Sequence, residues 1–104
     1  MIADSGGVGG GPAEDPVRLT VWVHGRVQGV GMRWWIRSRA LELGLVGSAR
    51  NLRDGRVEVV AQGVPERLDA LLAAIRRYEG AGRIDGVVEQ RSAARPGIEG
   101  FREL

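Results

Sequence analysis

The spacing of apolar residues changes along the chain, and the order of these changes constrains the fold more than any other feature. A spacing of two is typical of a strand with one buried face, and a spacing of three to four is typical of an amphipathic helix. Residues 17–24 alternate, with Val17, Leu19, Val21 and Val23 on one side and Arg18, Thr20, Trp22 and His24 on the other. Helical spacing follows at Met32, Ile36, Ala40 and Leu43, and Gly44 is a suitable C-terminal stop.

The rest of the chain continues this pattern. Residues 45–52 and 56–62 predict two strands of a hairpin around a turn at residues 53–55. Pro65 suits the first turn of a second helix, which ends by Gly80 and Gly82. The apolar stripe of that helix is formed by Leu68, Leu71, Leu72 and Ile75. Residues 84–93 predict a fourth strand and residues 98–102 a short edge strand. The sequence therefore predicts an α+β fold, a ferredoxin-like βαββαβ sandwich in which two helices cover one face of an antiparallel sheet.

This topology places two distant segments together. A right-handed crossover makes the first two strands parallel, and the third strand lies between them and antiparallel to both. The C-terminal ends of the first two strands then share one edge of the sheet. A glycine-rich loop follows the first strand, and Asn51 lies near the end of the second. The sequence thus predicts that Asn51 and Arg33 lie at the same rim.

The glycine-rich loop indicates a phosphate site. Its glycines allow the backbone to curl so that N–H groups point inward, and the helix that follows adds unpaired N–H groups and a positive dipole end. Arg33 lies in the first turn, where the dipole disfavours a cation unless an anion lies between them. The predicted cradle consists of Arg26, Val27, Gln28, Gly29, Val30, Gly31, Met32 and Arg33.

The chemistry of the rim favours a substrate with a good leaving group. The amide of Asn51 can both donate and accept, so it can orient a water molecule. The loop contains no Asp, Glu or Cys that would serve as a general base. A carboxylic–phosphoric anhydride needs little acid catalysis and fits such a site.

Composition excludes several other classes of site. The 104 residues contain no Cys, and all 15 basic residues are arginine, so thiol chemistry, Walker-type phosphate loops and Schiff bases are excluded. A single histidine, His24, cannot form a multi-histidine metal site, and we expect neither metal nor cofactor. The chain has no segment of transmembrane length and no secretory signal at its N-terminus, so we expect a cytoplasmic protein. Residues 1–16 are Gly-rich and predict a flexible N-terminal tail before a single domain at residues 17–104.

Over residues 17–103 the chain resembles the acylphosphatase family. The resemblance is carried by the loop Gly25-Arg26-Val27-Gln28-Gly29-Val30, by Arg33, Ala40, Leu43-Gly44-Leu45 and Gly47, and by Asn51, Asp54-Gly55 and Val57-Glu58-Val59. It implies a metal-free hydrolysis of acyl phosphates, in which Arg33 and the loop amides hold the phosphoryl group, Asn51 positions the attacking water, and the substrate helps to accept the proton.

This chain departs from the family pattern at three places. Met32 replaces the usual Phe, Ser48 replaces a common Trp, and Gly80-Ala81-Gly82 replaces a Gly-Pro motif. None of these changes removes a catalytic group, but Gly31 and Met32 could loosen the cradle and lower the rate.

Simpler roles exist for several of these residues. Arg26 is either solvated or steers anions, Asn51 could cap a hairpin, and His24 is expected to be structural. Trp34 and Trp35 are neighbours on the first helix and cannot both face the core, so one is expected to be exposed or to border the site.

Two other functions compete with hydrolysis. One is a non-catalytic module that binds phosphate or carbamoyl phosphate. The other is an RNA-binding domain, since such domains share this topology and the pI is about 10.3, but the first and third strands offer only Trp22 for base stacking and the net charge is only +2. The expected partner is therefore a small-molecule acyl phosphate, with no nucleic acid and no membrane, bound by a monomer.

Overall fold

The computed structural model describes residues 15–104, which form five strands and two helices after the first described residues Asp15 and Pro16. In chain order these are β2 (Val17–Arg26), α1 (Met32–Glu42), β3 (Val46–Asn51), β4 (Val57–Gly63), α2 (Pro65–Arg76), β5 (Arg83–Ala93) and β6 (Phe101–Glu103). The expected tail at residues 1–16 lies, except for its last two residues, outside the described residues.

The strands form one sheet in the order β5-β2-β4-β3-β6. Strand β4 lies between β2 and β3 and is antiparallel to both, so β2 and β3 run in the same direction, as the crossover argument predicts. The predicted fold class is confirmed. The short strand β6 adds one parallel pair, because Phe101 and Glu103 lie opposite Gly47 and Ala49 of β3.

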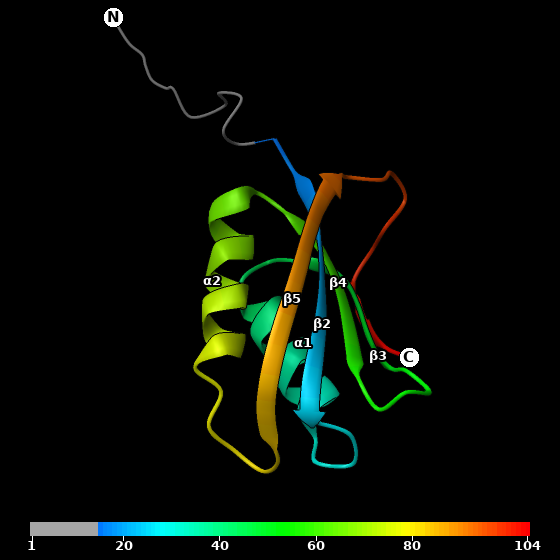
Figure 1. The fold of residues 1–104 in the computed structure, drawn as a ribbon. Helices are drawn as coiled ribbons and strands as arrows, with labels where there is room; N and C mark the ends of the chain where they lie inside the picture. Colours follow the sequence, from blue (N-terminus) through cyan, green and yellow to red (C-terminus); the bar gives the residue numbers. More distant parts are fainter. Residues whose placement is uncertain (1–14) are drawn as a thin grey trace, which may run out of the picture.

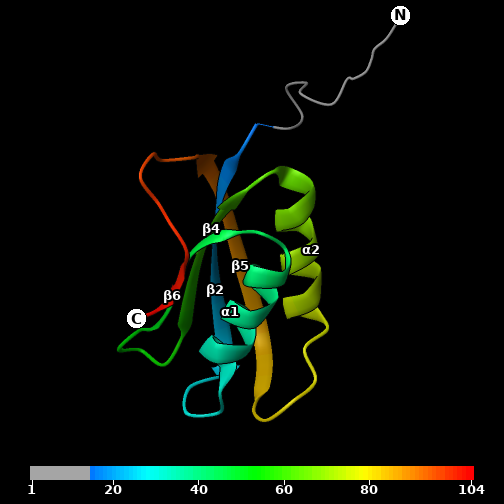
Figure 2. The same ribbon diagram turned by 180° about the vertical axis from the view of Figure 1, so that it is seen from behind.

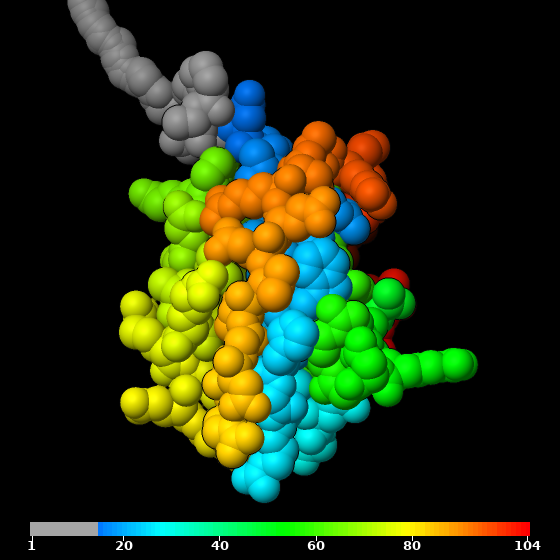
Figure 3. All heavy atoms as spheres, in the orientation of Figure 1, coloured from blue at the N-terminus to red at the C-terminus, as the bar shows by residue number. Residues whose placement is uncertain are grey.

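Both helices pack on the same face of the sheet (Figures 1 and 2). The core lies between these two layers and takes alternate residues of the central strands together with the predicted helix stripes. The fully buried residues include Leu19, Val21, Val23, Met32, Ile36, Ala40, Val57, Val59, Ala61, Leu68, Leu71 and Ile75. No helix of residues 15–104 covers the opposite face of the sheet, and Figure 3 shows the side chains of β2 and β5 lying side by side on it.

The last strand differs from its prediction for a local reason. The sequence predicts an edge strand at residues 98–102, but pairing with β3 begins only at Phe101. Gly97 and Gly100 both have positive φ angles, 81° and 67°, so the chain turns through this segment instead of extending. The carbonyl of Gly100 accepts a hydrogen bond from the Gly47 N–H at 2.8 Å, which starts the pairing.

The other boundaries agree within a few residues. Strand β5 begins at Arg83 rather than at residue 84, and α2 ends at Arg76, before the glycines that were expected to stop it. Within residues 15–104, no helix is both long and apolar enough to cross a membrane.

Candidate active site

The loop after β2 and the end of β3 meet at one rim of the sheet. A hollow of about 90 Å³ lies there, and it is lined by Val27, Gly29, Gly31, Met32, Arg33, Trp34, Asn51 and Glu103. The lining residues come from the β2–α1 loop, the first turn of α1, the end of β3 and strand β6. Arg33 and Asn51 thus line the same hollow although they lie 18 positions apart in the sequence, which is the arrangement that the topology predicts.

Several backbone N–H groups of the loop have no acceptor among residues 15–104. Gly29 and Gly31 have φ angles of 74° and 81°, in the left-handed region that glycine tolerates best. Gly31 caps α1 without a side-chain hydrogen bond, and the first helical bond runs from the Trp35 N–H to the Gly31 carbonyl at 3.0 Å. Among the backbone bonds outside regular elements in residues 15–104, none is donated by an N–H of residues 28–34. These donors lie at the positive end of the α1 dipole, which favours an anion.

Strand β6 and the residue that follows it accept hydrogen bonds from two arginines of α1. Nη1 of Arg33 donates to the main-chain oxygen of Leu104 at 2.6 Å. One turn later, Nε of Arg37 donates to the carbonyl of Phe101 at 2.8 Å. A guanidinium carries five N–H donors in a fixed plane, so the bond to Leu104 fixes its orientation and leaves further donors for an anion.

Gln28 joins the loop to the hairpin that carries Asn51. Its Nε2 donates to the carbonyls of Leu52 at 2.7 Å and Arg56 at 3.0 Å. An amide NH₂ has two hydrogens, so both donors are occupied by these carbonyls. Only the backbone N–H of Gln28 is therefore left for the predicted cradle, and its side chain instead holds the two halves of the site together.

The remaining cradle residues fall into two groups. Val27 and Met32 line the hollow but are each only 1% exposed, so their side chains belong to the core. Arg26 is exposed and Val30 packs against the core, and neither lines the hollow. The Met32 side chain fills an apolar position of the core directly beside the hollow.

The segment between α2 and β5 packs closely against the start of the glycine-rich loop. A Cβ on Gly82, whose φ is 88°, would overlap the carbonyl oxygen of Arg26 and contact Val30. A Cβ on Gly25 would likewise overlap the carbonyl oxygen of Arg83. These close approaches require glycine, and they hold the start of the loop against β5.

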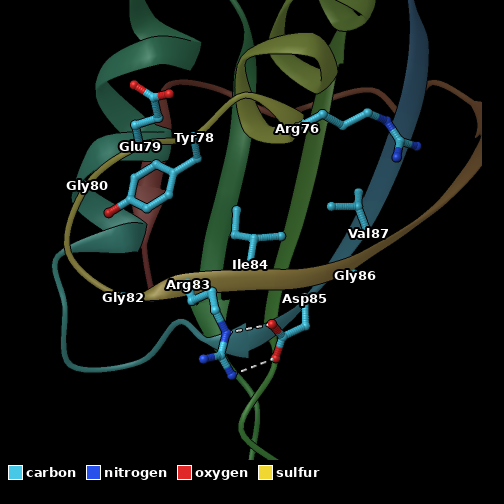
Figure 4. Close-up of a pocket in the computed structure, with 10 residues that line it drawn as sticks. All are labelled: Arg76, Tyr78, Glu79, Gly80, Gly82, Arg83, Ile84, Asp85, Gly86 and Val87. Atoms are coloured by element: carbon cyan, nitrogen blue, oxygen red, sulfur yellow. Dashed lines mark hydrogen bonds and ion pairs between the residues drawn. The ribbon is translucent and has the colours of Figure 1, made fainter.

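A larger hollow of about 530 Å³ lies beside this segment (Figure 4). The arginines that line it are paired with carboxylates: Arg83 with Asp85 at 2.7 Å and Arg76 with Glu89 at 3.1 Å. The hydrogen bonds from Arg83 hold the pKa of the Asp85 carboxyl below its usual range. Because its cations are already paired, this hollow is less suited to an anion than the smaller one.

Glu103 is a residue of the rim that the sequence did not indicate. Glu103 lines the hollow because β6 pairs in parallel with β3, which places Glu103 opposite Ala49, two residues before Asn51. The pairing partner of a three-residue strand has no signal in a single sequence. Among residues 15–104, no group of three or more His, Cys, Asp or Glu side chains could hold a metal ion.

The fold and the hollow together define a class: a small α+β domain with a glycine-rich loop, an arginine and an asparagine around one hollow at one end of its sheet. A sequence model of the acylphosphatase family matches residues 19–103. The acylphosphatase of Mycobacterium sp. (strain JLS) is 59% identical over 91 residues, covering 88% of this chain and 97% of the relative. The chain therefore belongs to the acylphosphatase family, and it is an enzyme that hydrolyses acyl phosphates.

Solved structures agree with this assignment. The crystal structure of the acylphosphatase from Bacillus subtilis superposes with a TM-score of 0.80 at 28% identity, covering 85% of this chain and 98% of that one. A structure of full-length HypF in a phosphate- and nucleotide-bound form has a TM-score of 0.78 at 17% identity, covering 88% of this chain and 12% of that one. At that identity the second similarity concerns the fold alone.

Proposed function

We propose that Arg33 and the backbone N–H groups of residues 28–34 bind the phosphoryl group of the acyl phosphate, and that Asn51 orients the attacking water. The water oxygen forms a bond to phosphorus while the bond between phosphorus and the acyl oxygen breaks. The acyl group leaves as a carboxylate, and the proton of the water passes to the phosphoryl oxygens and from there to solvent. The products are a carboxylate and inorganic phosphate.

The observation that carries this proposal is the shared hollow. Gly29, Gly31, Arg33 and Asn51 line one space of about 90 Å³, and within residues 15–104 no backbone bond outside the regular elements is donated by an N–H of residues 28–34. Negative charge shifts among the phosphoryl oxygens during transfer, and donors that are already oriented stabilise it without reorganising. The amide of Asn51 is neutral, so it can hold a water beside the phosphoryl group without repelling the anion.

Two substitutions test the division of roles. Arg33→Gln removes the charged donor and is expected to raise KM and to lower kcat, with a loss in kcat/KM of about a hundred- to a thousandfold. Asn51→Ala is expected to lower kcat by a similar factor with KM nearly unchanged, because the phosphoryl donors remain. Phosphate release from acetyl phosphate measures both constants. Asn51→Ala with the parental kcat would contradict the role of Asn51, and tight phosphate binding without any turnover would favour the non-catalytic module.

We also propose that the reaction needs no metal ion and that a cytoplasmic monomer carries it out. All of the proposed groups come from a single chain, so the site is complete without a partner subunit. Activity that persists after treatment with a chelator, and a single monomeric species in analytical ultracentrifugation, are the expected results. Activity that disappears with the chelator would contradict the metal-free mechanism.

A further inference from the structure

Two neighbouring tryptophans on α1 lie in very different surroundings. Trp35 is partly buried and packs edge-to-face on Tyr78, with ring centroids 4.9 Å apart, and the Arg39 guanidinium lies 5.8 Å from its ring. Trp34 is 61% exposed, the largest exposed fraction among the large apolar side chains of the described residues. Burial of apolar surface is what makes an indole stabilise a fold, so Trp34 contributes little in this way.

The position of Trp34 links it to the site. It lines the hollow next to Arg33, together with Gly29, Gly31 and Asn51. Side chains in a helix lean toward its N-terminus, so Trp34 covers the turn that precedes it, which here is the glycine-rich loop. The indole therefore stands at the rim of the hollow while most of its surface remains open to solvent.

The size of the hollow places the acyl group at that rim. The hollow of about 90 Å³ is much smaller than the hollow of about 530 Å³ beside β5, so an acyl group bulkier than acetyl extends beyond it when its phosphoryl group is bound. The other apolar side chains of the lining, Val27 and Met32, are buried. Trp34 is thus the exposed apolar surface that an acyl group meets when its phosphoryl group is bound.

We infer that Trp34 forms one wall of a subsite for the acyl group and makes the enzyme favour aromatic acyl phosphates over small aliphatic ones. This inference rests on the proposed phosphoryl site of Arg33 and the loop. A flat aromatic acyl group can stack on the exposed indole and bury surface on both partners, whereas an acetyl group is too small to do so. The stacking of two aromatic rings corresponds to about a tenfold higher kcat/KM for an aromatic acyl phosphate than for one that lacks this contact.

The test compares two substrates across four proteins. Values of kcat/KM are measured for benzoyl phosphate and for acetyl phosphate with the parent, Trp34→Ala, Trp34→Phe and Leu41→Ala. Leu41 is a matched control, because it is a 45% exposed apolar residue on the same helix, two turns beyond Trp34, and does not line the hollow. Trp34→Ala is expected to reduce the ratio of the benzoyl to the acetyl value by about tenfold, and Trp34→Phe to keep most of it. Leu41→Ala is expected to leave the ratio unchanged.

A failure of the proposed acyl subsite can be distinguished from a failure of the proposed phosphoryl site. A ratio that is the same in Trp34→Ala and in the parent, with acetyl phosphate still hydrolysed, would overturn the subsite and leave the proposed function standing. An equal change of the ratio in Leu41→Ala would also overturn it. If Arg33→Gln hydrolysed acetyl phosphate at the parental kcat/KM, the phosphoryl site itself would be wrong and the subsite would fall with it.

Discussion

Gln28 offers the sharpest test of how the two halves of the site are held together. Its Nε2 bonds to the carbonyls of Leu52 at 2.7 Å and Arg56 at 3.0 Å, one on each side of the β3–β4 turn. Gln28→Met keeps the length of the side chain and removes both bonds. At about 1 kcal/mol net for each bond, the free energy of unfolding is expected to fall by about 2 kcal/mol. For a domain of this size that corresponds to a decrease in Tm of about 8–16 °C.

The same substitution is expected to slow catalysis. Without the amide, the end of β3 is no longer tied to the loop, and Asn51 loses its position relative to the phosphoryl donors. Small misplacements of a catalytic group cost up to about a hundredfold in rate, so kcat is expected to fall by about ten- to a hundredfold. Urea unfolding measures the stability, and phosphate release from acetyl phosphate at a temperature where the variant is folded measures kcat.

Gln62 provides the matched control for this substitution. It is 6% exposed, its Oε1 accepts from the Arg95 N–H at 2.9 Å, and its Nε2 donates to the Arg95 carbonyl at 3.0 Å. It lies at the other end of β4, opposite Val46, whereas Asn51 pairs with Val57. Gln62→Met is expected to lower stability by at least as much and to leave kcat at the parental value. If Gln28→Met also lost stability without any loss of kcat, the positioning role of Gln28 would be refuted.

Three further predictions follow from single residues. Glu103→Gln removes a negative charge from the rim, so inorganic phosphate is expected to inhibit the enzyme about two- to fivefold more strongly at low ionic strength. This difference should vanish at high salt, and an unchanged inhibition constant at low salt would contradict the prediction. The hydrogen bond from the Arg56 N–H is the largest of the causes that lower the pKa of the exposed Asp54. The ionised carboxylate therefore stabilises the fold above its ordinary pKa of about 3.9, and this stabilisation is lost as the pH falls through the lowered pKa. NMR titration of Arg56→Met should show the Asp54 pKa still lowered, and a full return to the ordinary value would show that the side chain is the main cause. In Gly47→Ala the new Cβ would overlap the Val60 carbonyl oxygen, so we expect a loss of at least about 2 kcal/mol in urea unfolding, and a parental unfolding midpoint would contradict this.

The architecture and the meeting of the loop with Asn51 could be predicted because both depend on patterns that are local in sequence. Alternation in residues 17–24 and the helical spacing from Met32 to Leu43 fix the type and order of the first elements. The handedness of the crossover then fixes which strand ends share a rim. The loop was located by its glycines, whose positive φ angles at Gly29 and Gly31 meet the expectation.

The contacts made by individual side chains at the rim could not be predicted in this way. The arrival of Glu103 and Leu104 depends on a three-residue strand pairing in parallel with β3, and glycines at positions 97 and 100 delay that pairing. The side chain of Gln28 lies within the predicted cradle by sequence, yet its partners belong to another hairpin. Such contacts depend on where a side chain points in three dimensions, which periodicity does not encode.

In the proposed site, the glycine-rich loop and Arg33 hold a phosphoryl group beside Asn51. Titration of the ¹⁵N-labelled protein with inorganic phosphate, the product of the reaction, tests it most directly. We expect the largest shifts at the amides of residues 28–34, at the Arg33 guanidinium and at the Asn51 side chain, and we expect Arg33→Gln to abolish them. Shifts confined to the larger hollow around Arg83 and Asp85, with the loop unaffected, would contradict it.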